Sequence, residues 1–211
     1  PRSRGLGDVY KRQQSCNAPT RLLVPRAMQA GAVQIAREVA AQVCFDDSNP
    51  ATAIGPLANQ AQFERVQRVL GAVAQAPVCG GVGRPEALTT GFYTRPTVFA
   101  DVDPQSPIAR EEVFGPVLVI IPYDSEAQAI AIANDSPYGL SGYVSAGTLE
   151  RARFVARQLR TGMVHLNGSK ADNGAPFGGY KQSGNGREWG VFGLEDYLEV
   201  KSMFGYAPNP D

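Results

Sequence analysis

A cysteine near the start of the chain, Cys16 in the run QSCNAPTRLLVP, is the residue best suited to nucleophilic chemistry. An ionised thiol is the strongest nucleophile that a protein offers at neutral pH. The neighbours of Cys16 are polar, whereas Cys44 ends an amphipathic stretch and Cys79 lies in an apolar patch, which favours packing for those two. Two glycine-bearing stretches follow, REEVFGPV from Arg110 and APFGGYKQSGNGRE from Ala175. A thiol and two such loops suggest an enzyme that forms a covalent thio-intermediate.

Composition excludes several other classes of function. Twenty basic side chains balance twenty acidic ones in 211 residues, so no net charge attracts nucleic acid or an anionic membrane. No apolar run approaches the roughly 18 residues of a membrane helix. Three scattered cysteines argue against a disulfide framework and for a reducing, cytoplasmic location. With a single histidine, His165, and no CxxC pair, we expect no metal site.

The elements that must position these residues alternate between strand and helix. Strands are predicted at 21–24, 97–99, 117–122, 140–145, 163–166 and 197–203. Helices are predicted at 26–43, after a cap at Asn59, from Ser125 to Asn134, and at 148–159. The run VLVIIP at 117–122 is β-branched and wholly apolar, as in a strand covered on both faces. The pattern predicts an α/β fold with a mostly parallel sheet and helices on both faces.

Three regions are expected along the chain. Residues 1–13, PRSRGLGDVYKRQ, are basic and lack an apolar period, so we expect a frayed or foreign leader that resembles translated sequencing-adapter sequence. Residues 14–190 form the main domain. Residues 191–211 form a C-terminal segment whose tail alternates partly and resembles an exposed edge strand.

Several motifs in order resemble the NAD(P)-dependent aldehyde dehydrogenase family. They are QSCNAPTRLLV, IGPL, GFYTRPTVF, REEVFGPV, NDSPYGLSG, VHLN, PFGGYKQSGNGRE and YLEVKS. The resemblance covers nearly everything from Gln14 to Met203, and EEVFGPV and PFGGYKQSG are its most specific signals. It implies the catalytic domain of such an enzyme without its Rossmann cofactor domain, and a parent that assembles as a homodimer or homotetramer.

The resemblance implies roles for three residues that would touch reactants. Cys16 matches the catalytic cysteine, which attacks the aldehyde carbon, forms a thiohemiacetal and then a thioester. Glu112 matches the glutamate that binds the nicotinamide ribose hydroxyls of NAD or NADP, and Phe114 packs near the nicotinamide ring. Phe177 matches an aromatic residue that lines the tunnel for the small-molecule aldehyde.

The resemblance also implies supporting residues. Asn167 matches an asparagine that holds the loop near the nucleophile. Gly178 and Gly179 let the backbone approach closely beside Phe177. The KxSG signature at Lys181 is interpreted as a packing and turn element. The loop GSKADNGAP carries no aromatic residue, which favours a smaller or polar aldehyde.

Some expected parts are not found before Cys16. In the family the general base glutamate, the oxyanion asparagine and the Rossmann domain lie upstream, and none fits within residues 1–13. We therefore expect the C-terminal catalytic portion of a longer enzyme, inactive alone, because losing the base costs about 10²–10⁴-fold. Three alternatives stay open: acylation of coenzyme A, a thiol hydrolase pairing Cys16 with His165, and a non-enzymatic oligomerisation module. Apolar neighbours on both sides of His165 favour a satisfied core histidine over a base.

Overall fold

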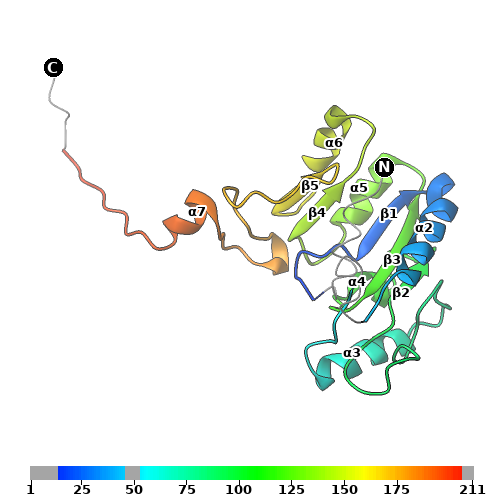
Figure 1. Cartoon of the computed structure of the whole chain (residues 1–211). Coiled ribbons are helices and arrows are strands. Elements are labelled where there is room, and N and C mark those ends of the chain that lie inside the picture. The colour runs from blue at the N-terminus through cyan, green and yellow to red at the C-terminus, as the bar shows by residue number, and fades with distance from the viewer. Residues whose placement is uncertain (1–13, 46–52, 206–211) are drawn as a thin grey trace.

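The run VLVIIP forms the central strand of the larger sheet, β3 (Val117–Tyr123), whose first six residues are buried. The computed structural model describes residues 14–45 and 53–205 (Figure 1). The other strands are β1 (Arg21–Pro25), β2 (Thr97–Ala100), β4 (Ser141–Val144) and β5 (Met163–Leu166). The helices are η1 (Arg26–Met28), α2 (Gln29–Ala41), α3 (Gln60–Gly71), α4 (Pro107–Arg110), α5 (Glu126–Asn134), α6 (Leu149–Ala156), η2 (Lys181–Ser183) and α7 (Gly190–Glu195).

All five strands pair in parallel, but in two sheets and not one. The first sheet has the order β1-β3-β2, and the second pairs β4 with β5. In the first, Leu23 lies opposite Ile121 and Phe99 lies opposite Val119. In the second, Tyr143 lies opposite His165. The prediction of an α/β fold with parallel strands is confirmed.

Helices cover both faces of the three-stranded sheet because successive side chains of β3 point to opposite faces. Leu118 and Ile120 pack with Ala36 of α2 on one face. On the other face, Val119 and Ile121 join a second core cluster to which α3, α4 and α5 also contribute, through Val66, Ile108 and Ile132. The expected burial of β3 on both faces is therefore confirmed.

The predicted helix starts are confirmed by their caps. Asn59 Oδ1 accepts a hydrogen bond from the Gln62 amide at 2.9 Å. Ser125 Oγ accepts one from the Gln128 amide at 3.2 Å. Each satisfies an amide of the first helical turn, which has no partner within the helix. The helices at 26–43 and 148–159 are shorter than predicted, and α4 and α7 were missed because four to six residues carry no measurable period.

The predicted strand at 197–203 is wrong for this chain. No strand is assigned there, and after α7 the segment extends away from the rest of the molecule (Figure 1). Tyr197 and Val200 are 87% and 94% exposed. Alternation alone does not make a strand, because a strand also needs a neighbouring strand to accept and donate its backbone hydrogen bonds. The expected leader at 1–13 lies outside the described residues.

In the described segments, no helix has both the length and the apolar character needed to cross a bilayer.

Replacing Ile120 by alanine should lower the free energy of unfolding by about 2–5 kcal/mol, since the side chain is fully buried in the central strand and leaves a cavity. Urea unfolding of the purified chain measures the change. Ile35→Ala is the matched control, because Ile35 is 52% exposed on α2 and its loss should cost under about 1 kcal/mol. Equal losses at the two positions would contradict the assignment of β3 as the core strand.

Candidate active site

Cys16 lies on a tight turn just before β1. The Ala18 amide donates to the Ser15 carbonyl at 3.0 Å and closes the turn around the cysteine. The thiol is exposed. The carbonyl of the next residue, Asn17, accepts a hydrogen bond at 2.9 Å from the hydroxyl of Tyr143 on β4. An accessible sulfur therefore sits on a backbone that is held from two sides.

The other two cysteines differ from Cys16 in exposure. Cys44 and Cys79 are half-buried, and each forms an isolated bridge with an extended neighbour, Ala53 and Val98. Burial raises the pKa of the Cys79 thiol, which disfavours its nucleophilic form. These environments agree with packing roles for both residues.

The segment Glu112–Phe114 is held through its backbone. Arg65 of α3 donates from Nη2 to the Glu112 carbonyl and from Nη1 to the Val113 carbonyl, both at 2.7 Å. Gln62 Nε2 donates at 3.0 Å to the carbonyls of Val113 and Phe114. Phe114 has φ of +56°, a left-handed conformation that costs energy in a bulky residue and so needs such support.

The side chain of Glu112 stays available within this fixed segment. It is exposed, and its carboxylate makes no hydrogen bond or ion pair with another described residue. A fixed carboxylate of this kind accepts hydrogen bonds from the hydroxyls of a ligand. Sequence reasoning missed Gln62 and Arg65; the available signal was two half-buried polar residues one turn apart on the amphipathic α3.

Phe177 is fixed by a two-residue bridge. Its amide donates to the Glu188 carbonyl and its carbonyl accepts from the Glu188 amide, both at 2.7 Å. Its ring lies 4.9 Å from that of Trp189, centroid to centroid. A side chain at Gly178 would collide with the Gly186 carbonyl oxygen. Position 178 therefore requires glycine on steric grounds.

Asn167 joins the loops that follow β4 and β5. Its Oδ1 accepts from the Ala146 amide at 2.9 Å, and its own amide donates to the Val144 carbonyl at 2.8 Å. With φ of +47°, Asn167 adopts a left-handed turn that asparagine tolerates better than most residues. The residue holds the two strand ends together, which agrees with a supporting role.

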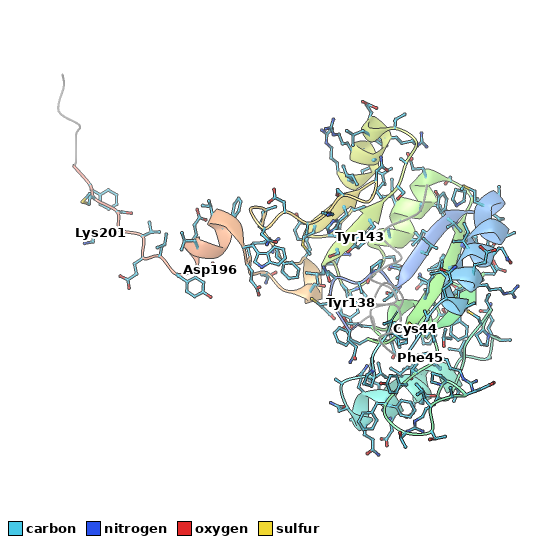
Figure 2. All side chains as sticks on the ribbon, in the orientation of Figure 1. Cys44, Phe45, Tyr138, Tyr143, Asp196 and Lys201 are labelled. Carbon is cyan, nitrogen blue, oxygen red and sulfur yellow. The ribbon has the colours of Figure 1, made fainter. Side chains whose placement is uncertain are left out.

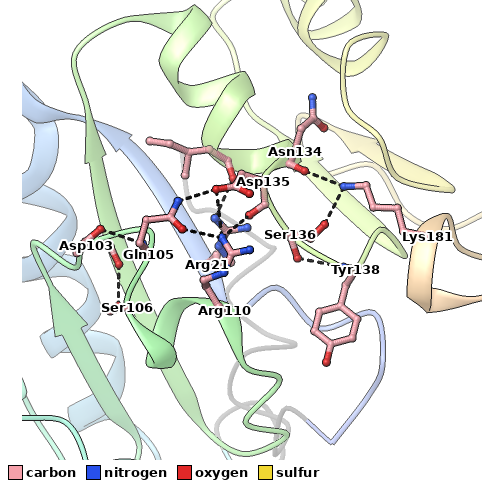
Figure 3. A network of polar contacts seen from close by, with 11 residues as sticks. Arg21, Asp103, Gln105, Ser106, Arg110, Asn134, Asp135, Ser136, Tyr138 and Lys181 are labelled. Atoms are coloured by element: carbon pink, nitrogen blue, oxygen red, sulfur yellow. Dashed lines mark hydrogen bonds and ion pairs between the residues drawn. The ribbon is translucent and has the colours of Figure 1, made fainter.

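The segment that follows α5 links the two glycine-bearing motifs (Figure 3). Arg110 Nη1 contacts Asp135 Oδ2 at 3.1 Å, and Gln105 Nε2 donates to the same oxygen at 2.6 Å. From the other side, Lys181 Nζ donates to the carbonyls of Asn134 and Ser136 at 2.7 and 3.0 Å. The expected packing role of the KxSG signature is confirmed by these contacts.

The same segment also reaches the strand that follows Cys16. Arg21 of β1 donates from Nη2 to the Ile132 carbonyl at 2.9 Å. Burial and the nearby Arg110 lower the pKa of Arg21, and Asp135 opposes the effect. Within residues 14–45 and 53–205, no hydrogen bond or ring contact joins Cys16, Glu112 and Phe177 directly. Their relative placement depends on the pairing of β1 with β3, on residues 132–139 and on Tyr143.

The thiol-hydrolase alternative and the question of a metal site can both be compared with this geometry. Among the described residues no hydrogen bond joins Cys16 to His165, whose Nδ1 lies 3.1 Å from the Ser169 carbonyl oxygen. No group of three or more His, Cys, Asp or Glu residues in the described part of the chain could hold a metal ion.

Comparison with known proteins explains this arrangement. Residues 7–203 match the aldehyde dehydrogenase family. The chain belongs to the aldehyde dehydrogenase family. A 3-succinoylsemialdehyde-pyridine dehydrogenase from a Pseudomonas species is 55% identical over 92% of this chain and 41% of its own length. A putative aldehyde dehydrogenase from Staphylococcus aureus is 43% identical over 92% of this chain and 42% of its own.

Solved structures of the family superimpose closely on the chain. Aldehyde dehydrogenase C from Pseudomonas syringae, in complex with NAD+ and octanal, has a TM-score of 0.92 at 48% identity, covering 98% of this chain and 43% of that one. The Mycobacterium tuberculosis aldehyde dehydrogenase with NAD+ has a TM-score of 0.90 at 42% identity, covering 98% and 44%. The chain spans about two fifths of the length of these aldehyde dehydrogenases.

Because of Asp135, the free energy of unfolding of the chain should fall at acid pH. Hydrogen bonds from Gln105 and Arg110 hold the pKa of its carboxyl below the usual value. Its stabilising contribution is therefore fully present above the unfolded-state pKa of about 3.9 and is lost as pH falls through the lower folded-state pKa. The urea midpoint of Asp135→Asn should lie below that of the wild type near neutral pH, and the gap should close below about pH 4.

The control for this prediction is Asp196→Asn, which removes one exposed carboxylate from the segment after α7. Its midpoint should follow the wild type at every pH. A gap for Asp135→Asn that stays constant from neutral to acid pH would contradict the role given to the Asp135 charge.

Proposed function

We propose that this chain supplies the nucleophile and part of the cofactor site of a cytoplasmic NAD(P)-dependent aldehyde dehydrogenase, which oxidises a small aldehyde to a carboxylic acid. The observation that carries the proposal is the exposed thiol of Cys16 on a turn tied to both its own backbone and β4. An accessible sulfur on a fixed backbone suits attack on an incoming carbonyl carbon.

In the proposed reaction the sulfur of Cys16 forms a bond to the aldehyde carbon, and negative charge moves to the aldehyde oxygen. The amide N–H of Cys16 is the donor in this chain that would stabilise that oxygen. NAD(P), when bound, supplies the hydride acceptor. The carbon bound to the Cys16 sulfur gives up its hydrogen as a hydride to that acceptor while its C=O bond re-forms, which leaves a thioester. Water then opens the thioester, releasing the carboxylic acid and restoring the thiol.

Glu112 and Phe114 are the residues that we propose hold the nicotinamide end of the cofactor. The carboxylate of Glu112 is exposed and has no partner among residues 14–45 and 53–205, which suits two ribose hydroxyls, and the half-buried Phe114 ring would pack near the nicotinamide. Arg65 and Gln62 fix the backbone of both residues. The residues fit a nucleotide because they combine a free acceptor with a rigid segment.

Phe177 is proposed to line the aldehyde tunnel, with Gly178 and Gly179 as its support, and Asn167 is proposed to hold the loop near the nucleophile. The ring of Trp189 beside Phe177 adds a second apolar surface. Two relatives are associated with aldehydes of different polarity. One was crystallised with octanal, and the other is named for a pyridine semialdehyde. The sequence expectation of a smaller or polar substrate therefore calls for assays with both kinds.

We further propose that the C-terminal segment takes part in a homodimer or homotetramer. Tyr197, Val200 and Phe204 are 87%, 94% and 96% exposed on a segment that extends from the molecule. Large apolar side chains gathered on an extended segment favour contact with another surface. Figure 2 shows Asp196 and Lys201 along the same extension, so charged residues lie among the apolar ones.

The nucleophile is tested by fusing residues 14–211 to the upstream portion of the 55% identical Pseudomonas relative. With aldehyde and NAD(P) the fusion should produce NAD(P)H and carboxylic acid, measured by absorbance and mass spectrometry. Cys16→Ala should lower kcat by at least about a thousandfold, because no other group forms the covalent intermediate.

Cys44→Ala is the control for this experiment, since that half-buried thiol has no proposed part in the reaction. It should retain activity within about threefold. Equal losses for the two alanine variants would contradict a special role for Cys16. If the fusion forms acyl-coenzyme A in place of the acid when coenzyme A is added, the thioester is opened by acyl transfer to coenzyme A and not by hydrolysis.

Glu112→Gln should raise the KM for the dinucleotide by about tenfold or more, since a hydrogen bond to a charged group contributes about 1.5–3 kcal/mol. The KM for the aldehyde should change little. Glu111→Gln removes the adjacent exposed carboxylate and serves as the matched control. If both variants, or neither, weaken dinucleotide binding in the same fusion protein, Glu112 is not the ribose ligand.

A further inference from the structure

Tyr143 connects the second sheet to the nucleophile turn. Its hydroxyl donates to the Asn17 carbonyl at 2.9 Å, across 126 residues of sequence, and the contact is partly buried. Figure 2 labels Tyr143 on β4. Asn17 follows Cys16 directly, so this bond fixes a carbonyl next to the cysteine. The hydrogen bond between Ser15 and Ala18 closes the turn but does not tie it to the body of the molecule.

His165 fixes the ring that carries this hydroxyl. Tyr143 and His165 are register partners on β4 and β5. Their rings stack with centroids 4.7 Å apart and planes 9° apart, close to the spacing of neighbouring strands. The imidazole is itself held, with Nδ1 at 3.1 Å from the Ser169 carbonyl oxygen. Stacking against His165 restricts the rotamers of Tyr143, so its hydroxyl points in one direction.

We propose that Tyr143 and His165 are a positioning pair for the Cys16 turn. The inference rests on the proposed function, because it concerns how Cys16 meets an aldehyde. Attack needs the sulfur over the carbonyl carbon while the Cys16 amide faces the oxygen that becomes charged. A shift of about 1 Å in such a site costs up to about a hundredfold in rate. Neither residue of the pair needs to touch the substrate or move a proton.

The first arm of the experiment measures whether the pair holds the turn. Hydrogen exchange of the Ala18 amide in the 211-residue chain reports opening of the turn, since this amide donates to Ser15. Tyr143→Phe keeps the ring but removes the hydroxyl and should speed this exchange by about two- to tenfold. Exchange in β3 should stay unchanged. Tyr197→Phe, which removes a phenol hydroxyl from an 87% exposed residue after α7, is the matched control.

The second pair of variants tests the stack. His165→Ala removes the stacked ring and should speed Ala18 exchange as Tyr143→Phe does, whereas His165→Phe keeps an aromatic ring and should stay near the wild type. The double variant Tyr143→Phe/His165→Ala should show no more effect than either single change, because both break one link. Additive effects, or an unchanged exchange rate in Tyr143→Phe, would overturn the inference.

The last arm measures catalysis in the fusion protein. Tyr143→Phe and His165→Ala should each lower kcat by about five- to a hundredfold, with the KM values for aldehyde and dinucleotide within about twofold of wild type. His165→Phe should restore kcat. Unchanged kcat in a variant whose turn is loosened also overturns the inference. A folded wild-type fusion that makes no NAD(P)H refutes the proposed function instead, and the exchange data still decide whether the pair holds the turn.

Discussion

The arrangement of the candidate site depends on one short segment, residues 132–139, which comprises the end of α5 and the loop after it. Its backbone carbonyls accept hydrogen bonds from Arg21 of β1 and from Lys181 of the glycine loop, and its Asp135 pairs with Arg110. Each cation belongs to a different motif of the site. Asp135 is the carboxylate that offsets the repulsion between Arg21 and Arg110. The Cys16 and Glu112 motifs are also joined through the pairing of β1 with β3, whereas Lys181 ties its loop to the segment itself.

The site is built mainly by side chains that bind backbone carbonyls. Arg65 and Gln62 hold the carbonyls of Glu112 to Phe114, and Tyr143 holds that of Asn17. Glu112 and Phe114 thus contribute their own backbone to the scaffold and keep their side chains available, while at Cys16 the neighbouring residue supplies the held carbonyl. This division of work resembles the general pattern of functional loops positioned by rigid elements.

The sequence predicted the elements well where local chemistry decides. The wholly apolar run of β3 and the caps at Asn59 and Ser125 needed only neighbouring residues to be recognised. The contacts that place the site were invisible because their acceptors are backbone carbonyls, which every residue has. Tyr143 and Asn17 lie 126 residues apart, and no spacing rule connects them. The predicted strand at 197–203 was wrong for a related reason. Alternation shows which side chains would share a face, but it does not supply a neighbouring strand to pair with.

The exposure of Cys16 follows from the same division of work. A nucleophile must reach a ligand, so it cannot be held by burial as Val66 and Ile120 are, and burial would also disfavour the thiolate, as at Cys79. Precision must then come from the backbone on either side of the sulfur. At the residue that follows Cys16, a restraint comes from the hydroxyl of Tyr143, whose direction is set by a ring stacked in strand register. The second sheet therefore contributes to the nucleophile through geometry alone, without placing a group at the reacting atoms.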